Sequence, residues 1–186
     1  MSGYLRISKK LRWSFGRARR MRKDESGAAA VEFALVSIPF FMILFAIIEV
    51  SLVFFANQIL DNAVADAARL IRTGQAQQQN FTTAKFKASV CDGLAGLFDC
   101  DEKLFLDVKT FTKFANVTIT TPIDEDGEIV DDFGYDDGGP ETIVVARVYY
   151  EWPLVTGFIK TGLGNLANGN RLLASVATFR NEPFPE

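Results

Sequence analysis

The chain has 186 residues, with 20 Lys and Arg, 23 Asp and Glu, and no histidine. Without histidine, Ser-His and Cys-His catalysis and histidine-ligated metal sites are all excluded. No glycine-rich phosphate loop is present. An enzyme that works with carboxylates alone stays an alternative, yet no residue pattern points to one. After a basic head and an apolar stretch, about 130 residues remain, which is one ordinary domain.

The first 27 residues form a strongly basic head. They carry a net charge of +7, which leaves −10 for residues 28–186. The basic residues are Arg6, Lys9, Lys10, Arg12, Arg17, Arg19, Arg20, Arg22 and Lys23, and the acids are Asp24 and Glu25. The positive-inside rule places the head in the cytoplasm and the C-terminal domain across the membrane. A nucleic-acid role is set aside, because basic clusters beside a span usually set topology.

An apolar run follows the head. No residue from Phe33 to Ile48 is charged, and if Glu49 is accommodated the run reaches Ala56, a length of 24 residues. At ~1.5 Å per residue, this covers a bilayer core of ~30 Å. We therefore predict one long helix over residues 28–73, with a single span over about 33–56. Pro39 lacks an N–H and is expected to kink it.

Two acids lie at the predicted span: Glu32 just before it, and Glu49 inside it as an intramembrane acid. Glu32 stands one residue before the apolar run, and an ionisable residue at membrane depth is functional by default. Glu49 has no obvious partner in the sequence, so we place it in the outer headgroup region. A secretory signal peptide is disfavoured, because the apolar core is long and the first small-x-small site, residues 63–65, comes late.

Beyond the span, the helix becomes amphipathic. Leu60, Val64, Ala67 and Ile71 recur at steps of four, three and four, which predicts one apolar stripe packed on the chain's own domain. Gly74 is a natural helix stop. A second, shorter helix is predicted over 81–97. The domain boundaries follow as 1–27, 28–75 and 76–186.

Four stretches have the pattern of β-strands: 104–109, 116–121, 142–152 and 171–180. The prediction is an α+β domain, with the long helix laid on one face of a four-strand antiparallel sheet. Residues 124–140 form a loop rich in acid and glycine. A calcium loop is the alternative there, but the EF-hand spacing fails, so a solvated loop is favoured.

The chain has two cysteines, Cys91 and Cys100, separated by eight residues. Outside the cytoplasm, two nearby cysteines usually form a disulfide. Two unpaired core thiols are the alternative. A redox site would need the closer Cys-x-x-Cys spacing, which is absent.

Several stretches together resemble a known family. Gly27 followed by four residues and then Glu32-Phe33 is similar to a pilin processing motif, in which an aromatic follows the glutamate. The runs at 30–35, 47–49 and 63–69 resemble the N-terminal signature of TadE-like minor pilins (pseudopilins) of the Tad (tight adherence) branch of type IV pili. The two cysteines and residues 179–184 are similar to what that family shows toward its C-terminus.

The resemblance implies a function and its partners. A prepilin peptidase would cut between Gly27 and Ala28, and Glu32 of one subunit would then pair with the Ala28 amine of a neighbour. Sister pilins, the inner-membrane assembly platform and the lipid bilayer would be the other partners, with no cofactor, metal or small-molecule substrate. The chain would span the bacterial inner membrane once, with its domain in the periplasm, and enter an extracellular pilus after processing.

Two alternatives stay open beside this hypothesis. The chain could be an uncleaved single-pass membrane protein with an extracytoplasmic binding domain. Glu32 could extend to the lipid headgroups without taking part in assembly.

Overall fold

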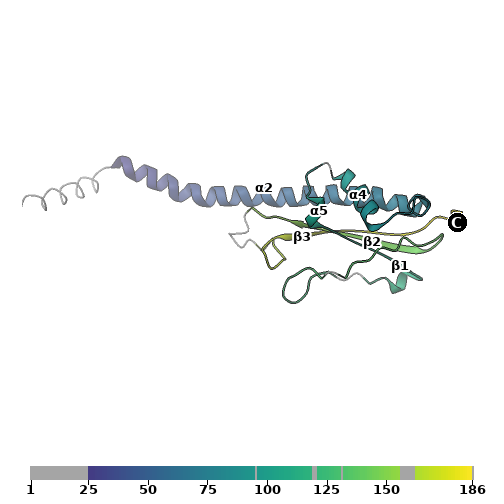
Figure 1. Cartoon of the computed structure of the whole chain (residues 1–186). Helices are drawn as coiled ribbons and strands as arrows, with labels where there is room; N and C mark the ends of the chain where they lie inside the picture. Colours follow the sequence, from purple (N-terminus) through teal and green to yellow (C-terminus); the bar gives the residue numbers. More distant parts are fainter. Residues whose placement is uncertain (1–24, 95, 119–120, 131, 156–161, 186) are drawn as a thin grey trace, which may run out of the picture. The chain divides into compact units, whose positions relative to one another are not determined.

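A computed structural model describes residues 25–94, 96–118, 121–130, 132–155 and 162–185 (Figure 1). Most of the predicted basic leader, residues 1–24, lies outside the described residues. The chain divides into two compact units, residues 1–45 and residues 46–186. The division falls inside one long helix, α2 (Glu25–Arg72).

The first unit contains the start of α2. Side chains from Gly27 to Phe45 are exposed, except for the half-buried Ser37, whose hydroxyl donates to the Ala34 carbonyl at 3.2 Å. Only 6% of the most apolar 18-residue window is buried. The core helix of a soluble protein would be mostly buried, so this helix is a candidate membrane span. Pro39 lies within it, and its kink stays a prediction.

The second unit is built on the rest of α2. The predicted stripe is confirmed, because Leu60, Val64, Ala67 and Ile71 are all buried. Three shorter helices follow: α3 (Gln75–Gln78), α4 (Thr83–Gly93) and α5 (Cys100–Lys103). The helix predicted over 81–97 is therefore shorter. It starts late because the Thr82 side chain caps it by accepting from the Lys85 N–H.

The sheet has three antiparallel strands in the order β1 (Leu104–Phe111), β2 (Ile143–Trp152) and β3 (Arg171–Arg180). One face packs with α2 and α4 in the main core, through Leu106, Val108, Val144, Ala146, Val148, Tyr150 and Leu173. A smaller cluster around Tyr149, Leu166 and Leu172 lies apart from that core. The unit is therefore α+β, as predicted.

The predicted fourth strand, residues 116–121, is wrong. Residues Phe114–Asn116 form a 3-10 helix, and 117, 118 and 121 lie in no strand; residues 119–120 lie outside the described part. The edge of β1 that faces away from β2 is already hydrogen-bonded to residues 134–136. The Val108 N–H donates to the Gly134 carbonyl at 2.8 Å, and the Asp136 N–H donates to the Val108 carbonyl at 2.9 Å. An alternating pattern shows that a stretch suits a strand, but not that an edge is open to it.

The acidic loop is tied to the rest of the second unit. The Gln77 side-chain amide donates to the carbonyls of Asp137 and Gly138, and the Asn181 side-chain amide donates to those of Asp137 and Gly139. Asn181 is itself buried. The second half of the loop is therefore held between α3 and the end of β3.

The C-terminal residues fasten the end of α2. The Glu182 N–H donates to the Arg72 carbonyl at 2.9 Å, one of the carbonyls that a helix end leaves unpaired. Gly74 has φ +79°, and the Phe184 ring lies where a side chain on Gly74 would stand, 2.5 Å from an added Cβ. Glycine is needed here for its conformation and for the space it leaves.

We predict that Gly74→Ala lowers the free energy of unfolding by about 2 kcal/mol more than Gly96→Ala does. Gly96 also has positive φ, but an added Cβ there meets nothing within 4 Å. Gly96→Ala therefore introduces the same kind of backbone strain as Gly74→Ala but no clash with a neighbouring side chain. Chemical unfolding of the full chain in detergent measures both variants. Equal losses would show that Phe184 is not held against the helix end.

Candidate functional site

The residues of the predicted processing motif lie in the first turns of α2. Gly27, Ala28, Glu32 and Phe33 are all exposed, and Phe33 keeps 72% of its surface. Ala28 and Glu32 are four residues apart, so they share one face of the helix, one turn from each other. The described structure thus leaves this face open to other molecules.

Gly27 is helical, and the packing of the chain gives no reason for a glycine. A Cβ built on it would meet nothing within 4 Å. A glycine in a helix costs about 1 kcal/mol relative to alanine. Gly27 therefore weakens α2 locally, and within the described chain that loss is not offset by any close approach of another backbone segment.

Glu49 has a partner in the structure that the sequence did not indicate, while its place in the outer headgroup region stays a prediction. It is 5% exposed, and the Val155 N–H, just beyond β2, donates to its Oε1 atom. The two residues are 106 positions apart, so no local pattern could reveal the contact. Within the second unit, Glu49 fastens the segment after β2 to α2.

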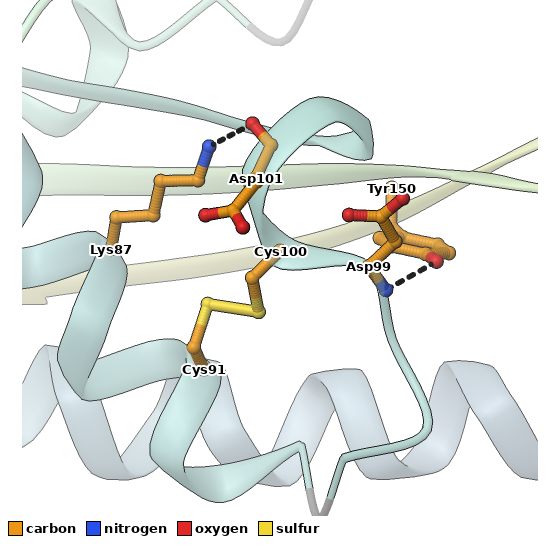
Figure 2. The surroundings of a disulfide bond; sticks show 6 residues. All are labelled: Lys87, Cys91, Asp99, Cys100, Asp101 and Tyr150. Carbon is orange, nitrogen blue, oxygen red and sulfur yellow. Dashed lines mark hydrogen bonds between the residues drawn. A yellow bond between two sulfur atoms is a disulfide. The ribbon is translucent and has the colours of Figure 1, made fainter.

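Cys91 and Cys100 are joined in a disulfide that links the end of α4 to the start of α5 (Figure 2). Polar contacts hold the same link. The Lys87 Nζ atom donates to the Asp101 carbonyl at 3.0 Å, and the Asp99 N–H donates to the Tyr150 hydroxyl at 2.9 Å. The predicted disulfide is therefore present in the structure, where it closes the short connection between α4 and β1.

A buried ion pair on the sheet was missed by sequence reasoning. Arg147 and Asp107 are 6% and 3% exposed, and the Arg147 Nη1 atom donates to Asp107 Oδ2 at 3.2 Å. Arg147 Nη2 also donates to the Thr118 carbonyl, and Asp107 Oδ1 accepts from the Gly134 N–H. The two residues stand opposite each other on β1 and β2. The Lys109 Nζ atom also lies 3.4 Å from Asp107 Oδ1. Through the Gly134 N–H, the pair ties the loop to the sheet.

Asp137 is a carboxylate with an altered pKa. Burial in the loop raises its pKa above the usual range, and its Oδ2 atom accepts from the Tyr135 hydroxyl at 3.3 Å. Burial, and then the charge of Asp137, also raises the pKa of Tyr135. An enzyme would need such a carboxylate facing a substrate. Here the carboxylate contacts Tyr135, and the backbone carbonyl of the same residue accepts from Gln77 and Asn181.

The raised pKa of Asp137 predicts a pH dependence of stability. The protonated form is favoured on folding, so its contribution is complete below the unfolded pKa of about 4 and is lost as pH rises through the folded value. Asp137→Asn cannot ionise and keeps an oxygen for Tyr135. We expect the stability of the variant relative to the wild type to be greater at pH 7 than at pH 4. Unfolding midpoints of the full chain at both pH values test this, and an equal difference at the two would contradict it.

Comparison with known proteins gives one match, which lies in α2. Residues 27–69 match the family model described as TadE-like protein. No curated protein and no solved structure matches the chain. The matched segment begins at Gly27, contains Glu32, Phe33 and Glu49, and ends before α4. The resemblance is therefore confirmed over this segment of α2, while the sheet lies outside the match.

Proposed function

We propose that the chain is a minor pilin, or pseudopilin, of a Tad-type pilus, which a prepilin peptidase cuts between Gly27 and Ala28. It would act in pilus assembly and initiation, and hence in adherence and biofilm formation. One observation carries the proposal. The family match starts at Gly27 and covers an apolar helix that is exposed at its start and buried on a folded α+β unit further on.

The local structure at Gly27 supports processing. Nothing in the described chain needs a glycine at position 27, whereas an extended chain in a narrow protease cleft would need a residue without a side chain there. The glycine also weakens the helix locally at the bond to be cut, which makes an extended conformation there less costly to reach. Cutting there removes the head of net charge +7, which otherwise retains the chain at the inner face.

The position of Glu32 supports a role in assembly. Cutting creates an amine at Ala28 that is cationic at neutral pH. In an apolar surrounding, an unpaired carboxylate is costly, so pairing with the amine of a neighbouring subunit would fix the register between the two. Glu32 also shares a helix face with the Ala28 of its own chain. The alternative remains that its side chain only extends to the headgroups.

The proposal includes location and partners. The chain would cross the inner membrane once, with its head in the cytoplasm and the second unit in the periplasm. Prepilin peptidase, sister pilins and the assembly platform would be its partners, and its role would be structural, not catalytic. An uncleaved single-pass protein with a binding domain is the second candidate, because the candidate span in α2 fits it equally well.

We predict that Gly27→Val blocks processing, because a branched side chain would not fit an extended chain in a narrow cleft. The intact mass of the membrane form then stays at full length, whereas the wild type loses residues 1–27. Ala34→Val is the control, since it adds comparable bulk to an exposed site on the same helix. Normal cutting of Gly27→Val, or a wild type that is never cut, would favour the uncleaved alternative.

We predict that Glu32→Gln is inserted and cut but fails to support piliation, because the side chain keeps its size and loses its charge. The buried amine left without a partner costs several kcal/mol, roughly 3–5. Glu32→Asp keeps the charge and serves as the control. Pull-down of sister pilins and counts of surface pili measure the effect. Wild-type levels of both for Glu32→Gln would mean that Glu32 only extends to the headgroups.

A further inference from the structure

One edge of the sheet is open. β3 pairs with β2 on one side only. The Asn181 N–H, just past β3, bonds inward to the Thr142 carbonyl, while the Leu172 N–H bonds outward to the side chain of Asn165. Backbone groups alternate in direction along an antiparallel strand, so the odd-numbered residues of β3 face β2 and the even-numbered residues face away.

The outward groups of β3 have no partner within the described chain. No hydrogen bond among the described residues reaches the N–H or C=O groups of Ala174, Val176 and Thr178. All three residues are exposed. The opposite edge differs, since Val108 at the centre of β1 is bonded on both its N–H and its C=O by the segment at 134–136. As far as the described residues show, the β3 edge from Ala174 to Thr178 is thus a row of donors and acceptors without partners.

This edge also lacks the features that usually protect one. Natural proteins keep edge strands short or place lysine, proline or a bulge on them. β3 has ten residues and pairs with β2 without interruption. Its only charged residues, Arg171 and Arg180, are at its ends, and Arg180 is bonded to Glu141. The uncharged centre is suited to pairing with another strand.

We propose that the β3 edge binds β3 of a second copy of this chain, which joins two three-strand sheets into one of six strands. Only an extended backbone supplies donors and acceptors at every second residue, as this edge requires. A second copy offers the same open edge, and pairing two uncharged centres places no like charges opposite each other. This goes beyond the proposed function, and it holds whether or not the head is removed.

The direction of the pairing follows from the second unit. β3 ends beside the end of α2, where the Glu182 N–H bonds Arg72. It starts opposite Trp152, three residues before the Val155 that bonds Glu49. β3 therefore runs the same way as α2. The direction therefore rests on the membrane anchor of the proposed function: two copies that enter one membrane at the start of α2 present their β3 strands in parallel, and the shared anchor raises their local concentration.

Parallel pairing also fixes which residues meet. In a parallel pair, the N–H and C=O groups of one residue bond the two neighbours of the residue opposite it. Two edges that both use even-numbered residues are thus shifted by one position. Val176 of one copy stands beside Ser175 or Ala177 of the other, and the two α2 helices lie on opposite faces of the joint sheet.

Proline at an outward position tests the proposal. Val176→Pro and Thr178→Pro each remove an outward N–H and no bond to β2. Val176→Ala also replaces the valine side chain but keeps the backbone N–H, so it is the matched control. The full chain, carrying two different tags, is reconstituted in phosphatidylethanolamine and phosphatidylglycerol vesicles and co-purified in mild detergent. An intact disulfide and an unchanged unfolding midpoint show that each variant is folded.

We expect co-purification of the two tags for the wild type and Val176→Ala, and about a tenfold loss for either proline variant. Hydrogen exchange in residues 174–180 is expected to slow when wild-type copies are concentrated in the vesicles, and not for Val176→Pro. Absence of association in the wild type, or equal association of the folded proline and alanine variants, would overturn the proposal.

Cysteine cross-linking tests the direction. A copy with Ala177→Cys is expected to form a mixed disulfide with a copy carrying Val176→Cys or Thr178→Cys. Two Val176→Cys copies are expected to stay unlinked, because residues of the same number point to opposite faces. A disulfide between two Val176→Cys copies, or none with either partner of Ala177→Cys, would overturn the parallel arrangement.

Discussion

The structure depends on one helix, α2, whose first part is exposed and whose later part is buried in the protein core. The start of α2, up to Phe45, exposes its apolar side chains, whereas Leu60, Val64 and Ile71 are at most 1% exposed. A helix can pass from one environment to the other because its backbone hydrogen bonds are made within it. The buried side of α2 is rich in alanine, at Ala56, Ala63, Ala67 and Ala68. Small residues allow close packing, as at Ala63, where Gly93 of α4 approaches so closely that an added Cβ would stand 2.8 Å from the alanine Cβ.

Within the second unit, the sheet and its loops are hydrogen-bonded to α2 near Glu49 and near Arg72, and they pack against the helix between these two residues. Glu49 bonds the segment after β2, and the Arg72 carbonyl accepts from Glu182 after β3. Gln77, just after the helix, bonds the acidic loop. The buried stripe supplies most of the stabilisation, since burying a large aliphatic side chain contributes about 1.5–3 kcal/mol. The polar contacts fix where along the helix the sheet lies, because a buried carboxylate or carbonyl without a partner is costly.

Two surfaces remain that the described chain does not satisfy by itself. One is the apolar face at the start of α2, and the other is the open edge of β3. Each suits an intermolecular partner, lipid or a neighbouring helix for the first and another strand for the second. Two polar pairs, in contrast, are satisfied within the second unit: the buried Asp107 pairs with Arg147, and the half-buried Asp137 carboxylate accepts from Tyr135.

The sequence by itself determined what depends on local patterns. The basic head, the uncharged run after Phe33, the buried stripe on α2 and the strand character of β1, β2 and β3 all follow from charge and periodicity. The family resemblance of residues 27–69 also lies within one continuous segment. Only the tertiary structure decided which partners distant residues meet. It gave Glu49 the N–H of Val155, paired Asp107 with Arg147, and bonded the centre of the β1 edge to residues 134–136, while the described residues of 116–121 lie in no strand. The reason is physical: period and composition show which face of an element is apolar, but hydrogen bonds across 27 or 106 residues depend on where the fold brings their backbones together.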